Sequence, residues 1–278
     1  VIPTRSGEDL YFDHASGCWR MYNYITGASS FDEIDSPERF RRAGGAFGEF
    51  AMLLSDLPGE SLSETIPDFH NTAKRYEAFL SAVEEDRFSR AASALSEIEF
   101  LKNRCAEMSV LVDLASSGEL PVRVTHNDTK LNNVLFDDVT GETVCVVDLD
   151  TVMPGLSLYD FGDSIRYGAN TAAEDEKDLS KVAVSPQMYE AFTEGYLSQA
   201  GSVLNKKELE LLPFSAKLLT MECGMRFLTD WLSGDTYFST AYAGHNLVRA
   251  KCQLALAADM ERNMTELEKI TELVIGAA

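Results

Sequence analysis

The hydrophobic and polar positions of this chain follow a strand-like pattern at its beginning and a helical period over most of the remainder. Residues 9–13 and 18–25 are rich in aromatic and aliphatic side chains and flank Gly17, which predicts a β-hairpin. Residues 26–30 have the small and polar composition of a connector. These patterns predict a short β region followed by a connector before the first helix.

The first predicted helix begins at Pro37, because Ser36 is a good N-cap and proline is favoured in the first turn. It is expected to run to about Leu57, where Pro58 follows. Further amphipathic helices are predicted over 71–85, 89–116, 159–167, 185–199, 206–233, 244–262 and 265–275.

A compact group of strands is predicted between these helices, over 122–125, 133–136 and 143–147, with Gly141 in the turn between the last two. Strands and helices do not alternate along the chain, so the order predicts an α+β fold rather than a doubly wound parallel sheet. We expect a mostly helical lobe that carries a small β insert.

Composition and charge narrow the classes of function. The chain has 278 residues with 24 basic and 45 acidic side chains, a formal net charge of −21. Such a surface repels phosphate backbones, which argues against a nucleic-acid partner. We see no apolar run of membrane-spanning length and no leader-like segment, and five scattered cysteines without a CxxC pair are typical of a reducing cytoplasm. We therefore expect a cytoplasmic protein with no membrane partner, as a monomer or a weak homodimer.

The most informative stretch is residues 125–135, T-H-N-D-T-K-L-N-N-V-L, which contains H-x-D-x-x-x-x-N between two predicted strands. A second acid, Asp148, ends the next apolar segment. Phosphoryl transfer from ATP needs a carboxylate that accepts the proton of the acceptor hydroxyl, and oxygen ligands for Mg²⁺. We assign Asp128 as the catalytic base, which also contacts the substrate, and Asn133 and Asp148 as metal ligands. Asp150 is a candidate either to support these ligands or to bind a second metal ion.

Each of these residues also has an ordinary structural explanation. Loops rich in Asp and Asn are frequently turns, and Asp148 alone could cap a helix. Lys130 could steady a transferred phosphate, in a cofactor-binding role, or could be a solvated loop residue. His126 is expected to brace the loop backbone. The combination of loop, order and spacing favours the kinase interpretation.

Two other motifs are interpreted as decoys. The sequence D-F-G at 160–162 comes after Asp148, the metal-ligand candidate, and does not include it. We therefore expect Asp160 and Asp163 to be helix caps or loop anchors. The glycines of residues 43–48 do not follow a strand, so we expect them to allow close helix packing rather than nucleotide binding.

The chain resembles the aminoglycoside phosphotransferase/choline kinase superfamily, whose catalytic loop is H-x-D-x4-N followed by a strand that ends in aspartate. Within it, residues 125–135, 147–155 (V-D-L-D-T-V-M-P-G) and 159–166 (Y-D-F-G-D-S-I-R) are similar to N-acetylhexosamine 1-kinases. The resemblance implies a protein-kinase-like fold of the aminoglycoside phosphotransferase type. It also implies ATP and Mg²⁺ as cofactors, and N-acetylglucosamine or N-acetylgalactosamine as a substrate that is phosphorylated on its anomeric hydroxyl.

The resemblance also implies binding residues. Arg226, Asp230 and Tyr237 correspond to the sugar-binding segment, although an intrahelical Arg–Asp ion pair is the simpler explanation for the first two. The backbone of Tyr22, Asn23 and Tyr24 corresponds to the hinge that binds adenine.

The resemblance is incomplete at the beginning of the chain. No glycine-rich hairpin and no strand lysine precede residue 9, so the small lobe is expected to be largely missing. We interpret residues 1–25 as a remnant of the N-terminal β lobe and hinge, and residues 26–278 as the helical catalytic and substrate-binding lobe. Residues 1–278 alone are expected to be a weak catalyst or inactive. A kinase for choline, homoserine, an aminoglycoside or another alcohol, or a non-catalytic sugar- or nucleotide-binding remnant, is the alternative.

Overall fold

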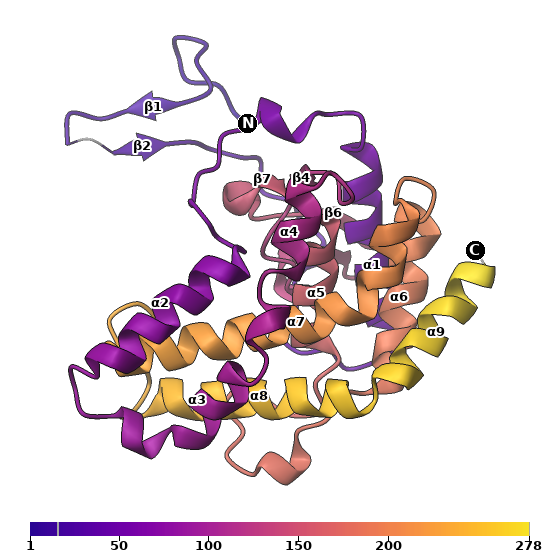
Figure 1. The fold of residues 1–278 in the computed structure, drawn as a ribbon. Coiled ribbons are helices and arrows are strands. Elements are labelled where there is room, and N and C mark those ends of the chain that lie inside the picture. Colours follow the sequence, from indigo (N-terminus) through magenta and orange to yellow (C-terminus); the bar gives the residue numbers. More distant parts are fainter. Residues whose placement is uncertain (16, 278) are drawn as a thin grey trace.

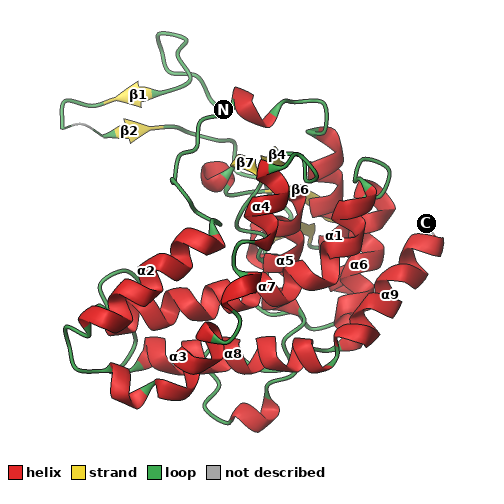
Figure 2. Ribbon diagram, viewed as in Figure 1, coloured by secondary structure: helices red, strands yellow, loops and turns green. Residues whose placement is uncertain are grey.

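The structure, a computed structural model, describes residues 1–15 and 17–277. A helical body carries small β-sheets on one side, and the N-terminal hairpin projects away from it (Figures 1 and 2). The helices are α1 (Pro37–Leu53), α2 (Thr72–Glu85), α3 (Leu95–Lys102), α4 (Val110–Ser116), α5 (Ser157–Gly168), α6 (Pro186–Ala200), α7 (Lys206–Leu232), α8 (His245–Arg262) and α9 (Met264–Ala277). Helix α7 is buried along most of its length and packs against α5, α8 and α2, so it forms the centre of the body.

Side-chain caps begin several helices where the sequence predicts them. Ser36 accepts a hydrogen bond from the third residue of α1, and Asn71 does the same for α2. At α7, Asn205 and Glu208 form a reciprocal capping box. Helix α1 ends at Leu53, one turn before the end that was predicted from Pro58.

Small residues bring α1 and α6 into close contact, as predicted for residues 43–48. A Cβ atom on Gly44 would lie 2.5 Å from the carbonyl oxygen of Phe192, and one on Gly48 would lie 2.4 Å from that of Tyr196. On α6, a Cβ atom on Gly195 would lie 1.8 Å from the carbonyl oxygen of Arg41. The two backbones approach too closely for any side chain at these positions, so the glycines serve packing.

The strands form three small antiparallel sheets. They are β1 (Tyr11–Phe12) with β2 (Cys18–Trp19), β3 (Ala28–Ser29) with β5 (Val134–Asp137) and β6 (Thr143–Val146), and β4 (Arg123–Thr125) with β7 (Met153–Gly155). The hairpin around Gly17 is confirmed, although its strands are shorter than predicted. The prediction of a connector over 26–30 was wrong in part, because β3 pairs with β5 more than one hundred residues later. Strand β7 was missed, because Pro154 and Gly155 suggested a break; an edge strand tolerates both residues.

The single helix predicted over 89–116 was also wrong. The chain forms α3 and α4 with short 3₁₀ turns before each of them. The buried side chains Ile98, Leu101, Met108 and Leu111 keep a roughly helical spacing, which explains the prediction. The break lies around Asn103 and has no glycine or proline to mark it, so tertiary packing decides it.

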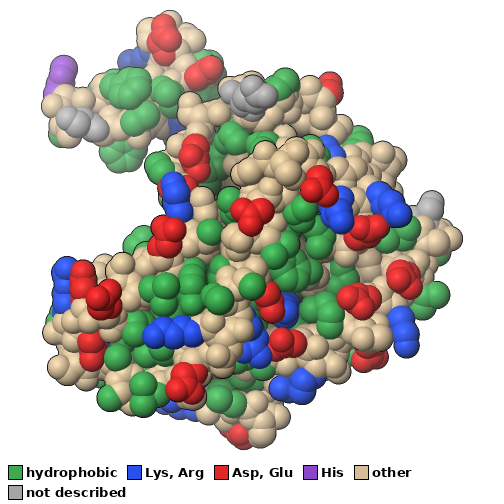
Figure 3. Space-filling model, in the orientation of Figure 1, with side chains coloured by type: hydrophobic (Ala, Val, Ile, Leu, Met, Phe, Trp, Pro, Cys, Tyr) green, Lys and Arg blue, Asp and Glu red, His purple; other side chains and the backbone are tan. Residues whose placement is uncertain are grey.

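Among the described residues, no helix combines the length and the apolar character needed to cross a bilayer. In the space-filling view, hydrophobic side chains gather on the projecting N-terminal hairpin, and charged side chains of both signs are scattered over the body (Figure 3).

Candidate active site

The candidate catalytic loop, residues 126–133, joins β4 to β5 and is held in place by α5. The carboxylate of Asp160, in the first turn of α5, accepts the backbone N–H groups of His126 (2.9 Å) and Asn127 (2.7 Å). Its backbone carbonyl accepts the Thr129 hydroxyl at 2.6 Å, and Ser164 donates to the carbonyl of Thr129 at 2.9 Å. Asp160 is therefore the loop anchor that the sequence suggested. Asp163 is not, because it forms a buried ion pair with Arg166 within α5.

His126 and Asn127 shape the loop from inside. His126 is fully buried, its Nε2 lies 2.9 Å from the carbonyl oxygen of Val147, and its Nδ1 lies 3.4 Å from the amide nitrogen of Asp128. Asn127 adopts a left-handed conformation (φ 64°), which asparagine tolerates better than most residues. Its side-chain amide donates to the carbonyls of Thr125 and Thr151. The predicted bracing role of His126 agrees with these contacts.

Asp128 is oriented by two neighbours that the sequence also singled out. Asn133 Nδ2 donates to the carbonyl oxygen of Asp128 (2.7 Å) and to its Oδ2 (3.1 Å). Lys130 Nζ lies 2.8 Å from Oδ1. Burial disfavours the charged ammonium, but Asp128 outweighs it, and the pKa of Lys130 is raised above its ordinary value. Both oxygens of the candidate base are therefore fixed in direction.

The two metal-ligand candidates lie beside the ends of two paired strands, Asn133 directly before β5 and Asp148 two residues after β6. Val147 donates its N–H to the carbonyl of Asn133 (2.9 Å), and Asp148 is the next residue, exposed and in a left-handed conformation (φ 60°). Among the described residues, the Oδ1 atom of Asn133 accepts no hydrogen bond, so it is available to a cation. No group of three or more Asp, Glu, His or Cys side chains in the described chain forms a closed metal cage. Mg²⁺ keeps several waters and binds phosphate oxygens, so it does not require a closed cage of protein ligands.

A cavity of about 330 Å³ opens between the catalytic loop and helices α5, α7 and α8. Four Lys or Arg side chains and four carboxylates line it together with His70, so the cavity is not acidic although the chain carries −21. They are Lys130, Arg166, Arg226 and Arg249 against Asp128, Asp163, Glu174 and Glu222. The cavity unites Asp128, Lys130 and Arg226, which lie far apart in the sequence.

Arg226 forms the wall opposite the catalytic loop. Its guanidinium carbon lies 5.1 Å from the ring centre of Phe69, 5.6 Å from that of Phe238 and 6.0 Å from that of Tyr237. It makes no hydrogen bond or ion pair with the described residues under the usual distance limits. Its N–H donors therefore have no partner among the described residues, and the side chain lines this cavity.

Asp230 and Tyr237 lie on the other side of Arg226 and line a separate cavity of about 240 Å³. The Asp230 carboxylate accepts the backbone N–H groups of Thr236 (2.9 Å), Tyr237 (2.8 Å) and Phe238 (3.0 Å), and the side-chain amide of Asn246 (2.9 Å). The alternative explanation, an Arg226–Asp230 ion pair, does not hold, because the two side chains form no ion pair. Asp230 instead anchors the loop that carries Tyr237 and Phe238 against Arg226.

The adenine-hinge candidates Tyr22, Asn23 and Tyr24 are exposed and lie outside the regular strands. They do not line the cavity around Asp128. Arg20, just before them, forms an ion pair with Asp150, which links this segment to the turn that follows Asp148. Asp150 is therefore engaged with the N-terminal segment.

Sequence reasoning missed several residues that line the cavity, among them His70, Glu222 and Arg249. His70 and Glu222 form a buried pair, with Nδ1 of the ring 2.8 Å from Oε1. A histidine before a helix and a glutamate inside another helix carry no local signal, so only the packing of α2 against α7 reveals them.

Comparisons with known proteins show the family and the fold of the chain. A sequence profile described as "Phosphotransferase enzyme family" matches residues 3–201. Among solved structures, an ethanolamine kinase from Plasmodium vivax is similar, with a TM-score of 0.53 and 16% sequence identity over 88% of this chain and 67% of that one. At this identity the likeness shows the fold, a kinase-like arrangement with a predominantly helical body.

Proposed function

Because the chain belongs to the phosphotransferase enzyme family, we propose that it transfers the γ-phosphoryl group of ATP to the anomeric hydroxyl of an N-acetylhexosamine. N-acetylglucosamine and N-acetylgalactosamine are the intended acceptors, and the products are ADP and the sugar 1-phosphate. One observation carries the proposal: Asp128, held in direction on both oxygens, faces the same polar cavity as Arg226.

Asp128 acts as the base in this proposal. The acceptor hydroxyl lies against its carboxylate, the hydroxyl oxygen bonds to the γ-phosphorus, and the bond from that phosphorus to the β–γ bridging oxygen breaks. The hydroxyl proton passes to Asp128. Lys130, 2.8 Å from Asp128, brings a positive charge to the place where the phosphoryl group moves.

Asn133 and Asp148 would hold Mg²⁺, which when bound neutralises phosphate charge. The backbone of Tyr22, Asn23 and Tyr24 would bind adenine, supported by its exposure and by its position outside the regular strands. In a chain of net charge −21, these local donors and the metal offset the field that otherwise repels ATP.

The cavity suits a polyhydroxylated acceptor better than a quaternary amine. A choline site needs aromatic rings around an open cation position. Here the rings of Phe69, Phe238 and Tyr237 already surround the guanidinium of Arg226. The balanced set of donors and acceptors can bond several hydroxyl groups and an acetamido group at once.

ADP release by the complete natural protein, measured over a panel of acceptors with and without Mg²⁺, tests the proposal. We expect the highest kcat/KM for the two N-acetylhexosamines and no turnover without a divalent cation. A higher kcat/KM for choline, ethanolamine, homoserine or an aminoglycoside would replace the sugar by that alcohol. Absence of ADP release with every acceptor would favour a non-catalytic binding protein.

A further inference from the structure

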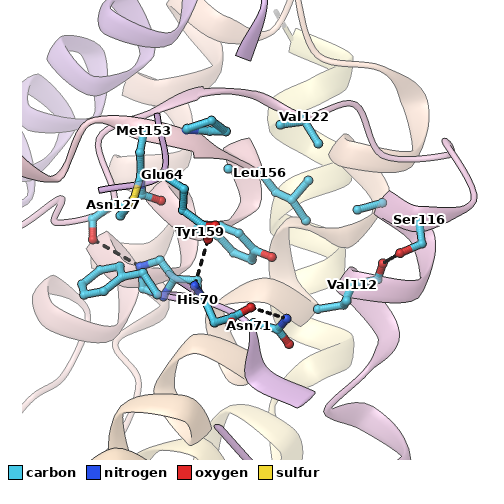
Figure 4. Close-up of a pocket in the computed structure, with 15 residues that line it drawn as sticks. Glu64, His70, Asn71, Val112, Ser116, Val122, Asn127, Met153, Leu156 and Tyr159 are labelled. Carbon is cyan, nitrogen blue, oxygen red and sulfur yellow. Dashed lines mark hydrogen bonds between the residues drawn. The ribbon is translucent and has the colours of Figure 1, made fainter. Parts of the chain in front are cut away.

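His70 lies where the loop before α2 meets α7 and the catalytic loop, and it takes part in the walls of two cavities. One is the cavity around Asp128, and the other is a smaller cavity of about 200 Å³ beyond Asn127, shown in Figure 4. The imidazole is 7% exposed and lies against the ring of Tyr159, with ring centres 5.1 Å apart. Packing therefore fixes the plane of the ring.

Both ring nitrogens of His70 face hydrogen-bond acceptors. Nδ1 lies 2.8 Å from Oε1 of Glu222, and Nε2 lies 3.2 Å from the carbonyl oxygen of Asn127. Neutral imidazole has only one N–H, whereas the imidazolium has two. Both bonds form together when His70 is protonated and Glu222 is ionised, and Thr72 donates its hydroxyl to the other oxygen of Glu222.

The surrounding charges support the imidazolium. Burial disfavours it, but Glu222 on α7 outweighs burial, and the pKa of His70 is raised above its ordinary value of 6.5. Burial likewise disfavours ionised Glu222, but His70 outweighs it and lowers the pKa of that carboxyl. From α5, Asp160, Asp163 and the phenol of Tyr159 also face this region, and from α7 Arg226 opposes the positive charge.

The carbonyl that His70 binds belongs to the peptide group that leads into Asp128. A peptide group is planar, so its C=O and N–H are fixed together. His70 approaches the C=O of Asn127 from one side, and Nδ1 of His126 lies 3.4 Å from the N–H of Asp128 on the other. The peptide at the left-handed Asn127 is thus held at both ends.

We propose that His70 is a positioning residue for phosphoryl transfer: Glu222 of α7 keeps it an imidazolium, and its Nε2–H donates to the Asn127 carbonyl and so fixes the Asp128 carboxylate against the acceptor cavity. The inference rests on the proposed phosphotransferase function and adds to it a link between the helical acceptor wall and the catalytic base.

Two amide substitutions separate this role from simple packing. The amide nitrogen of glutamine reaches the position of Nε2 and can donate to the Asn127 carbonyl. That of asparagine reaches only the position of Nδ1 and can donate only to Glu222. His70→Gln should keep kcat within about 3-fold of wild type, and His70→Asn should lower kcat about 100-fold, because a small displacement of a catalytic group costs about that much. KM for ATP and for the acceptor should change little in either variant.

The measurement uses the complete natural protein with the best acceptor of the panel, so the identity of the acceptor does not affect the comparison. Thermal unfolding of both variants verifies that they fold. Equal kcat in the two folded variants, whether high or low, would overturn the positioning role. If the wild-type protein turns over other alcohols but not N-acetylhexosamines, the proposed acceptor is refuted and the positioning role of His70 is not.

The pH dependence gives a second readout. A raised pKa means that the imidazolium is complete below pH 6.5 and is lost as pH rises through the raised value. Wild-type kcat should therefore fall on the alkaline side with a step that His70→Gln lacks. NMR of the His70 ring nitrogens should show both predominantly protonated at pH 6.5, the ordinary pKa of the ring, a readout that needs no turnover. A neutral ring at that pH, or the same alkaline step in His70→Gln, would overturn the imidazolium clamp.

Discussion

The catalytic loop buries polar side chains, whereas the N-terminal segment exposes aromatic ones. Both are the reverse of the usual relation between polarity and burial. In the loop, His126 is 0% exposed and Asn127 is 3% exposed, and both form hydrogen bonds within the protein. In the N-terminal segment, Tyr24 is 86% exposed and Phe12 is 67% exposed, although both are aromatic. Figure 3 shows the hydrophobic surface of this hairpin standing apart from the body.

The comparison shows which region depends on particular residues. Buried polar groups destabilise the fold unless they are hydrogen-bonded, so each group in the loop needs its specific partner. Exposed aromatic side chains with few neighbours contribute little to stability. Substitutions in the loop should therefore have large effects, and substitutions in the N-terminal segment should have small ones.

The largest effect is expected at the centre of the loop. Asp128→Asn removes the proton acceptor while it preserves the shape of the side chain, and general-base catalysis contributes about 10²–10⁴-fold. We expect kcat to fall about 1000-fold while ATP binding, measured by calorimetry, stays within a factor of about 2. Turnover near the wild-type rate would exclude Asp128 as the base.

The next effect concerns the anchor under the loop. Asp160→Ala leaves the buried N–H groups of His126 and Asn127 without their acceptor. We expect about 3 kcal/mol lower free energy of unfolding in urea titrations, because unsatisfied buried donors cost about 1–3 kcal/mol each and coupled losses do not simply add. Asp178→Ala, at an exposed carboxylate that caps a 3₁₀ turn, is the matched control. Equal losses in the two variants would contradict the anchoring role.

A smaller effect is expected at the acceptor wall. Arg226→Ala removes donors that face the cavity, and a charged hydrogen bond contributes about 1.5–3 kcal/mol. We expect the acceptor KM to rise about 10-fold or more in initial-rate assays, with a smaller change in KM for ATP. Arg262→Ala, at the end of α8, serves as control. An unchanged acceptor KM would remove Arg226 from the acceptor site.

The smallest effect is expected in the N-terminal segment. Tyr24→Ser replaces a side chain that is 86% exposed, so the free energy of unfolding should change by less than about 0.5 kcal/mol in the same urea titrations. A loss comparable to that of Asp160→Ala would show that the segment packs against the body, and the contrast between the two regions would fail.

Local signals made part of the fold and the site predictable. The caps Ser36 and Asn71 act within one turn of their helices, and residues 43–48 needed only their small size to indicate close packing. The sequence placed Asp128 and Asn133 in one loop, and in the structure their side chains lie 3.1 Å apart. Membership of the phosphotransferase enzyme family agrees with the kinase-like fold expected from these motifs.

Other features depend on partners far away in the sequence. Asp230 was expected to face a ligand or Arg226, but four N–H donors from the following loop and from α8 surround it. The predicted missing part of the small lobe, the adenine hinge and the metal ligands stay predictions.

The sequence by itself determined the helices with local caps, the catalytic loop and the order of its chemical groups, because these depend on neighbours within a few residues. Only the tertiary structure decided the break between α3 and α4, the pairing of β3 with β5, and the contact of His70 with Glu222 and Asn127. The physical reason is that a buried polar group or an edge strand is satisfied by whichever partner the packed helices bring to it, and no local pattern encodes that partner.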